Sequence, residues 1–326
     1  MWGDTEPSKS RRMVSRRTLA DLRLGDKISG SDPSHLDVLP AWLDRERFHR
    51  GQIFFQKRLT SVTFAFHMSL VCGISVPNLQ NVLVQTQQTN TPVKAMKRYL
   101  ETFHHLLLWH TGDVWNVGSK AHRSLGAVRI MHAKAANEMR MVDKSRVIHV
   151  NQYDMALVQC GFMGAVILYP HQLGIKCSLE ELEDYIYFWK CIGYLLGMED
   201  KYNLCDSAEY ESTMMLAREI EQKILLPSMK NPTADCMLLT DAYCLGVNRI
   251  VGFPLFTKEA CYALAFDFAN VKVPKLSWKD WARYHSYKLF LRLVRSWPWF
   301  SMKLNNLVLQ NFYLFEQRSV PNAPST

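Results

Sequence analysis

Two segments decide the fold of this chain: residues 94–110 (KAMKRYLETFHHLLLWH) and residues 125–139 (LGAVRIMHAKAANEM). In both, apolar side chains recur at steps of three and four residues, which is the period of an amphipathic helix. We therefore predict two helices, joined by a loop around residues 109–124. The first helix has an apolar face and an opposite polar face, and the polar face carries Arg98, Glu101, Thr102 and His105.

The second segment places a histidine, His132, within an apolar stripe. The stripe consists of Leu125, Val128, His132, Ala135, Ala136 and Met139. Because the residues beside the imidazole are alanines, a large flat group has room to approach, as an axial haem ligand requires. A core histidine with a hydrogen-bond partner fits the same pattern, and Arg98 with Glu101 fits a helix-surface ion pair. The residues alone leave these alternatives open.

Five blocks spread over about residues 43–200 carry a further signal. They are residues 47–55 (RFHRGQIFF), the Arg98-x-x-x-Thr102 pair, residues 128–133 (VRIMHA), residues 151–156 (NQYDMA) and residues 187–197 (YFWKCIGYLLG). In this order and spacing the blocks resemble the catalytic-domain family of rubber oxygenases and ER-bound oxygenases. That family includes the bacterial latex-clearing proteins and a fungal ER oxygenase of mycophenolic acid biosynthesis.

The resemblance implies an all-α fold, a single large helical domain over residues 41–315 with a globin-like core that holds haem b. It implies that His132 is the proximal ligand of the haem iron and the metal-binding residue. Arg98 and Thr102 would line the distal side of the haem. The expected cofactor-binding residues are His132, Arg98, Arg129 of the same signature, and Ala136 on the face of His132.

The implied activity is a haem-dependent oxygenase that uses O2 to oxidise or cleave a carbon–carbon double bond of an apolar, isoprenoid-like substrate. The expected catalytic residues are Arg98, Thr102 and Glu101. Rubber-cleaving members have a lysine where this chain has Glu101, and residues 76–93 lack the carboxylate that those members carry upstream. These departures speak against rubber itself as the substrate. They leave open a haem-binding sensor or carrier without catalysis, and a haem-free helical interaction protein derived from the family.

Composition narrows the partners of the chain. Its 326 residues suffice for one large domain or two modest ones, and 48% hydrophobic with 21% charged residues is ordinary for a globular protein. A net charge of +9 allows attraction to anionic surfaces. However, no nucleic-acid motif is present, so we predict no nucleic-acid partner. The oligomeric state stays open.

Cysteine usage and the N-terminal segment bear on the compartment. The eight cysteines form no CxxC pair, which favours free thiols in a reducing compartment over a disulfide framework or a zinc site. Residues 1–40 are polar and basic and lack the apolar core of a secretory signal, so we predict a poorly ordered tail there. A second tail is predicted at residues 316–326. We expect an intracellular protein, either cytoplasmic or associated with the ER membrane.

Two apolar segments raise the question of membrane contact. Residues 59–76 are long enough to approach a bilayer span, but Pro77 ends the segment and we favour a buried core helix. Residues 278–293 are basic and aromatic, which is typical of a membrane-surface helix and also of a helix docked on a core. We favour the docked helix and keep peripheral membrane contact as an alternative. Further helices are predicted at residues 152–169, 179–196 (with a capping box of Ser178 and Glu181), 209–226, 234–250, 257–268 and 304–315.

Overall fold

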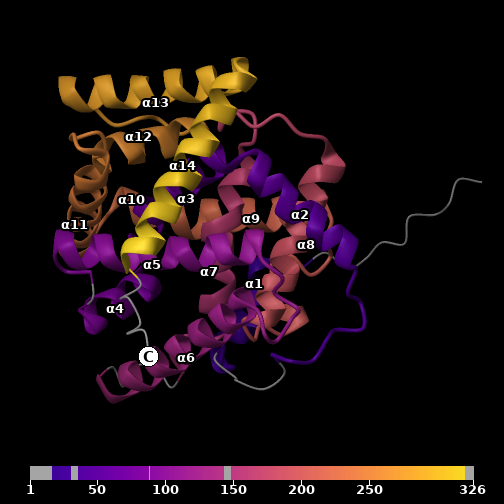
Figure 1. Cartoon of the computed structure of the whole chain (residues 1–326). Helices are drawn as coiled ribbons and strands as arrows, with labels where there is room; N and C mark the ends of the chain where they lie inside the picture. Colours follow the sequence, from indigo (N-terminus) through magenta and orange to yellow (C-terminus); the bar gives the residue numbers. More distant parts are fainter. Residues whose placement is uncertain (1–16, 31–35, 88, 143–147, 320–326) are drawn as a thin grey trace, which may run out of the picture.

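The computed structural model describes residues 17–30, 36–87, 89–142 and 148–319, with side chains through residue 310. Within these ranges the secondary structure is helical, apart from one isolated antiparallel bridge between Ser29 and Asn151. The predicted all-α class is therefore confirmed, whereas the globin-like core stays a prediction. Figure 1 shows helices packed across one another, with α6 along the lower edge and α13 along the upper edge.

The α-helices are α1 (Leu19–Arg23), α2 (Arg45–Lys57), α3 (Leu59–Gly73), α4 (Pro77–Thr86), α5 (Pro92–Thr111), α6 (Lys120–Val142), α7 (Gln152–Leu168), α8 (Leu179–Leu195), α9 (Tyr210–Ile220), α10 (Leu226–Lys230), α11 (Ala234–Val251), α12 (Lys258–Phe268), α13 (Trp278–Ser296) and α14 (Pro298–Ser319). Short 3-10 helices span Leu24–Lys27 and Asp200–Tyr202, and Glu221–Leu225 forms a π-helix between α9 and α10. All the predicted helices are present, with ends shifted by a few residues.

Helix starts follow from side chains that satisfy the first free backbone amides. The Thr91 hydroxyl accepts from the amide of Lys94 (3.4 Å), and Pro92 occupies the first turn, where no amide donor is needed. Ser178 and Glu181 form the predicted capping box of α8, because each side chain bonds to the backbone amide of the other residue (3.1 and 3.0 Å). These starts are confirmed as the sequence predicts them.

Helices α2 and α8 pack face to face, and glycine makes their close approach possible. A Cβ atom on Gly51 would lie 2.6 Å from Cβ of Phe188, and closer still to the carbonyl oxygen of Asp184. The buried carboxylate of Asp184 accepts two hydrogen bonds from the guanidinium of Arg50 (2.7 and 3.1 Å). Phe48 stacks on Phe188 with ring centroids 5.1 Å apart. The first block of the family resemblance, residues 47–55, is thus the α8-facing part of α2.

This pair of helices also holds the two segments that the sequence singled out. The side-chain amide of Gln52 on α2 donates to the carbonyl oxygens of Trp109 and Gly112, both at 2.8 Å, and so fixes the C-terminal end of α5. On the other side, Nη1 of the buried Arg129 on α6 donates to the carbonyl oxygen of Leu195, at the end of α8 (3.1 Å). Consequently α5 and α6 are positioned by the same scaffold.

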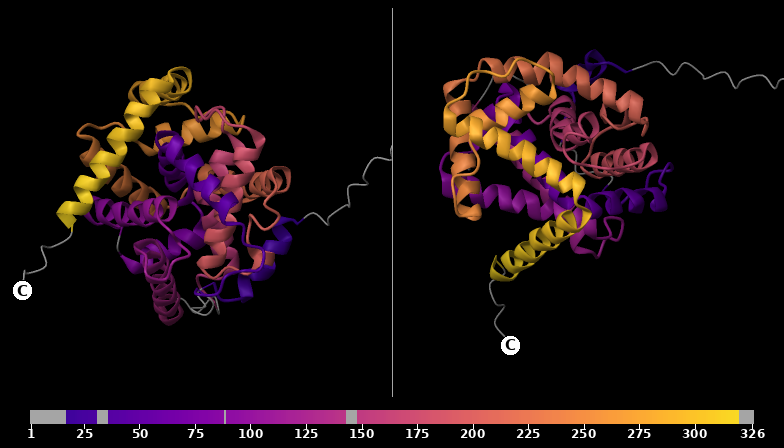
Figure 2. Two further views of the ribbon diagram at one scale, coloured as in Figure 1. Left: turned by 45° about the vertical axis from the view of Figure 1, so that its right-hand side comes forward. Right: turned by 90° about the horizontal axis from the view of Figure 1, so that it is seen from above.

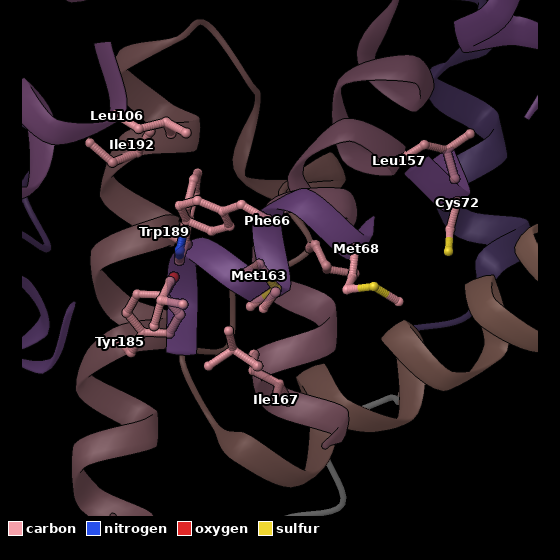
Figure 3. Packing of buried hydrophobic residues seen from close by; sticks show 14 of the residues in the cluster. Phe66, Met68, Cys72, Leu106, Leu157, Met163, Ile167, Tyr185, Trp189 and Ile192 are labelled. Atoms are coloured by element: carbon pink, nitrogen blue, oxygen red, sulfur yellow. The ribbon is translucent and has the colours of Figure 1, made fainter. Parts of the chain in front are cut away.

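The core lies where α3, α7 and α8 meet. Figure 3 shows Phe66 of α3, Met163 of α7 and Trp189 of α8 close together, and the rings of Phe66 and Trp189 meet edge to face at 6.4 Å. α3 is buried along most of its length, which agrees with the favoured core helix. In the described residues, no single helix is apolar and long enough to cross a bilayer. The bent pair of α3 and α4, with an angle of 89°, meets that test by length and composition only.

The two predicted tail boundaries, at residues 40 and 315, differ from the structure. The boundary of the predicted tail at residue 40 is too late, because Leu19 and Leu22 of α1 are buried and the amide of Leu19 donates to Glu219 (2.9 Å). Apolar residues within a polar segment made this docking possible and were not recognised. α14 is described through Ser319, beyond the predicted end at residue 315. Residues 1–16 and 320–326 lie outside the described residues.

We expect Gly51→Ala to lower the free energy of unfolding by about 1–3 kcal/mol, because the added methyl group meets backbone that cannot move without separating α2 from α8. Gly161→Ala on α7 is the matched control, since a Cβ there meets nothing within 4 Å. That control should stabilise the protein by up to about 1 kcal/mol through helix propensity. Urea unfolding of the three proteins measures both values, and equal stability of Gly51→Ala and wild type would refute the close contact.

Candidate functional site

The candidate site lies where α4, α5 and α6 approach one another. Nδ1 of His105 on α5 and Oγ of Ser124 on α6 are 2.7 Å apart, and the indole NH of Trp109 donates to the same hydroxyl oxygen (3.0 Å). These contacts fix the N-terminal half of α6 against the C-terminal half of α5. Eight residues after Ser124, or about two turns further along α6, lie His132 and its neighbouring alanines, which are half-buried.

His132 carries a buried nitrogen atom with no hydrogen-bond partner. Nδ1 of its half-buried side chain is inaccessible to solvent and unpaired. Burial, and secondarily the nearby positive charge of Arg98, lowers the pKa of His132 to about 4. The imidazole is therefore neutral at pH 7 and keeps a lone pair for a ligand. An unsatisfied buried polar atom costs on the order of 1–3 kcal/mol, which a bound ligand would recover.

Four other buried or half-buried histidines differ from His132 in having a partner. Nδ1 of His67 is 2.8 Å from the Tyr243 hydroxyl, which agrees with its expected role as a core histidine. Nδ1 of His105 bonds to the hydroxyl of Ser124. Nδ1 of His110 bonds to the carbonyl oxygen of Leu106, and Nδ1 of His122 bonds to that of Val114. Nε2 of His110 is also buried without a partner, but Nδ1 of His110 is bonded and its ring stacks on Phe55 in the core.

Arg98 faces the same region from α5. Nη1 of Arg98 donates to the hydroxyl of Thr86 at the end of α4, at 3.4 Å. The positive charge of Arg98 also contributes to the lowered pKa of His132, after burial. A contact between these two residues, which the sequence placed on separate helices, stays a prediction. Sequence reasoning missed Thr86, since the segment before α5 showed only a run of polar residues and no motif.

Thr102 is half-buried one turn after Arg98, but its hydroxyl is engaged. It donates to the carbonyl oxygen of Arg98 in its own helix, at 3.1 Å. Threonine in a helix commonly bonds to the carbonyl four residues earlier in this way. The oxygen atom of Thr102 can still accept a hydrogen bond, whereas donating one to a ligand requires the hydroxyl to rotate.

Glu101 is not placed with the other predicted catalytic residues. Its side chain is exposed and its carboxylate lies 4.0 Å from Nζ of Lys97, one turn earlier on α5. On the regular helix α5, Glu101 lies at the solvent-facing margin of the face that Arg98 and Thr102 share, and its catalytic role stays a prediction. The ion pair joins Glu101 to Lys97 rather than to Arg98, and pairs so exposed contribute little to stability.

The two remaining predicted cofactor residues have different surroundings. Ala136 is half-buried, one turn after His132 and on its face. Arg129 is buried and bonds to the end of α8, as described above, so the structure gives it a role in positioning α6. A contact between Arg129 and a cofactor stays a prediction.

These residues fit a haem better than a metal held by side chains alone. Among the described residues, no three His, Cys, Asp or Glu side chains are grouped so that they could hold a metal ion. Haem iron needs only one protein ligand on its proximal side, because the porphyrin supplies four nitrogen atoms. A neutral, unpaired imidazole beside alanines, with a guanidinium nearby, meets that need.

A separate apolar cavity of about 100 Å³ lies away from His132. Its walls come from α3, α4, α7, α9, α12 and the π-helix, and none of its lining residues belongs to α5 or α6. At its edge the hydroxyl of Tyr169 donates to the buried carboxylate of Glu221 (2.6 Å), which Arg218 also contacts (2.6 Å).

Sequence reasoning missed the π-helix. Pro227, which has no amide hydrogen, was the available signal that a regular helix is interrupted there.

Comparison with known proteins gave one match. The model of the family described as "ER-bound oxygenase mpaB/B'/Rubber oxygenase, catalytic domain" matches residues 58–303, which is more than half of the chain. The matched range includes α5 and α6 and starts after the block at residues 47–55. No curated protein and no solved structure matched.

We expect Arg98→Met to raise the pKa of His132 in the haem-free protein, because it removes a nearby positive charge that disfavours the imidazolium form. Lys97→Met is the matched control, since it removes the same charge from the neighbouring exposed position. NMR titration of the His132 ring protons measures the pKa. An unchanged midpoint in Arg98→Met, or an equal rise in both variants, would contradict the proximity of the two residues.

Proposed function

This chain belongs to the family of ER-bound oxygenases and rubber oxygenases whose catalytic domain it matches, and on that basis we propose that it binds haem b through His132 and uses O2 to oxidise an apolar, isoprenoid-like substrate. The observation that carries the proposal is the buried, unpaired Nδ1 of His132. It belongs to the residue that the family resemblance assigns to the iron.

His132 supports haem binding through its protonation state and its neighbours. A pKa of about 4 keeps the imidazole neutral near pH 7, and a neutral imidazole is the form that binds iron. Ala135 and Ala136 offer little bulk on the same face. When bound, haem supplies the one-electron and oxygen chemistry that amino-acid side chains lack.

Arg98 and Thr102 act in this proposal as polar groups of an otherwise apolar site. Arg98 is held by Thr86, and its guanidinium can bind a carboxylate of the cofactor or stabilise negative charge on a reacting oxygen atom. Thr102 can accept a hydrogen bond while its own proton stays on the backbone of α5. The family, rather than the geometry, supplies the class of substrate with carbon–carbon double bonds.

A haem-binding protein without turnover is the second candidate. It is favoured by the position of Glu101, where the resemblance to rubber-cleaving members calls for a lysine over the iron. Glu101 is exposed and paired with Lys97, so this chain has no cation at that position to replace the lysine. Binding of haem without consumption of O2 would identify this second function.

For haem binding, we expect the purified protein to show a Soret absorbance band, directly or after reconstitution with haem. His132→Gly should lose at least about tenfold in haem affinity, because it removes the one proposed protein ligand. Added imidazole should restore the band by entering the vacated space. His171→Gln is the control, since this exposed histidine lies outside α5 and α6. A band that is unchanged in His132→Gly would contradict the assignment.

For catalysis, we expect O2 consumption with a polyisoprenoid or sesquiterpenoid substrate. Arg98→Met and Thr102→Val should each lower the rate by about tenfold or more, as expected when a polar group near the reacting atoms is removed. Glu101→Gln should keep the wild-type rate, because its side chain is exposed. An oxygen electrode with haem-loaded proteins makes the measurement. Wild-type rates in both the Arg98 and Thr102 variants would refute their roles.

A further inference from the structure

The outer face of α13 exposes large apolar side chains. Trp278 is 77% exposed, and Trp281 and Leu289 are each exposed by more than half. Along α13 these residues lie three, eight and eleven positions apart, and these spacings place them on one face of the helix. The opposite face is the buried one, and it consists of Tyr284, Tyr287, Leu291 and Val294. α13 is thus docked on the core, as the sequence analysis favoured, and yet it is apolar toward solvent.

The corner between α13 and α14 continues this surface. Trp297 and Trp299 are each more than half exposed, and their rings stack with centroids 6.5 Å apart. Met302 on the first turns of α14 is also exposed, and Nζ of Lys303 lies over the Trp299 ring at 5.3 Å. Four of the chain's nine tryptophans therefore face solvent on two consecutive helices. Tryptophan is usually largely buried, so this grouping calls for a partner.

The charge of this segment points to the kind of partner. Residues 271–303 contain eight Lys and Arg and one acidic residue, Asp280, so that a tenth of the chain carries seven of its nine net positive charges. Two of these cations stand beside exposed tryptophans, because Nζ of Lys279 lies 5.7 Å from the ring centre of Trp278 and Lys303 lies over Trp299. Lys275 and Arg292 of the same segment are exposed as well. An anionic surface would complement this charge.

The segment is held firmly to the rest of the protein. The Tyr287 hydroxyl donates to the carbonyl oxygen of Leu255 (2.8 Å), and Nζ of Lys288 pairs with Asp267 of α12 at 2.7 Å. The amide and the hydroxyl of Thr60 on α3 both donate to Oδ1 of Asn305 on α14, at 2.9 and 2.6 Å. Figure 2 shows the two helices on the outside of the molecule, at its C-terminal end. The exposed tryptophans therefore sit on a fixed surface.

We propose that the outer face of α13, with the corner at Trp297–Trp299 and the first turns of α14, binds the surface of an anionic lipid bilayer. Tryptophan prefers the depth of the lipid headgroups, where its ring is apolar and its NH meets polar groups. Basic side chains beside it are attracted to anionic lipids, while Leu289 and Met302 enter the acyl boundary. The proposal rests on α13 and α14 alone and does not depend on haem or catalysis.

A lipid surface explains more of these residues than a nucleic acid does. Nucleic-acid binding uses cations against phosphates and aromatic rings against unstacked bases. It gives no reason for aliphatic side chains such as Leu289, Met302 and Leu307 to face solvent among the cations. A bilayer takes up all three kinds of side chain. It also dissolves apolar substrates of the class proposed above, so that docking would place the enzyme at its source of substrate.

Flotation of the full-length protein with lipid vesicles tests the proposal. We expect binding to vesicles of phosphatidylcholine mixed with phosphatidylserine, weaker binding to phosphatidylcholine alone, and release from the anionic vesicles by salt. The variant Trp278→Ser/Trp281→Ser/Trp297→Ser/Trp299→Ser should lose at least about tenfold in affinity for the anionic vesicles. Lys279→Gln/Arg292→Gln/Lys303→Gln should lose affinity for the anionic vesicles and keep whatever binding to neutral vesicles the wild type shows.

Ile130→Ser/Met141→Ser is the control, because it removes exposed apolar side chains from α6, outside the proposed surface. Circular dichroism should show unchanged helix content in all variants, since every substituted side chain is exposed. If the fourfold tryptophan variant has lost helix content, the single variants Trp278→Ser and Trp299→Ser take its place. Absence of vesicle binding by the wild type, or equal binding by wild type and tryptophan variants, overturns the proposal. Tight binding to duplex DNA or RNA with none to vesicles overturns it in favour of a nucleic-acid surface.

Discussion

The close contact between α2 and α8 is the constraint on which the rest of this structure depends. Gly51 lets the two backbones approach, and Asp184 is buried there with the guanidinium of Arg50 bonded to both of its oxygen atoms. A buried carboxylate is tolerated only when it is paired, so this contact tolerates little variation. From this pair, Gln52 fixes the end of α5 and the end of α8 accepts from Arg129 of α6. Residues outside the site thus help to position the two site helices, together with the direct contacts of His105 and Trp109 with Ser124.

The site carries a cost in unpaired polar atoms, because His132 keeps a buried nitrogen atom without a partner. Gln52, Arg50 and Asp184 of the scaffold are paired, although the Tyr185 hydroxyl and the indole NH of Trp189 on α8 are also buried without one. The pKa of His132, lowered to about 4, means that the folded protein binds fewer protons than the unfolded chain between about pH 4 and 6.5. Stability contributed by the neutral imidazole is therefore present above that window and lost as the pH falls through it.

Much of the fold and part of the candidate site could be predicted from the sequence, and the features that the prediction missed have physical causes. The period of apolar residues located the helices, and Thr91 with Pro92 or Ser178 with Glu181 located their starts, because these effects are local. Steps of three and four residues placed Glu101 on the face of Arg98, but they could not show that its side chain is exposed at the margin of that face. Thr86 and the contact of Leu19 with the segment of Glu219 depend on residues far apart in the chain. The family resemblance supplied what periodicity cannot, namely the prediction that Arg98 and His132 act together.

The measurement that tests the account most directly is a crystal structure of the protein loaded with haem. The account predicts a porphyrin between α5 and α6, with a ring nitrogen atom of His132 bonded to the iron and Arg98 on the same cleft. It also predicts that α2 and α8 keep their contact at Gly51. A porphyrin bound elsewhere, or a His132 ring closed in by side chains and hydrogen-bonded to one of them, would contradict the central claim.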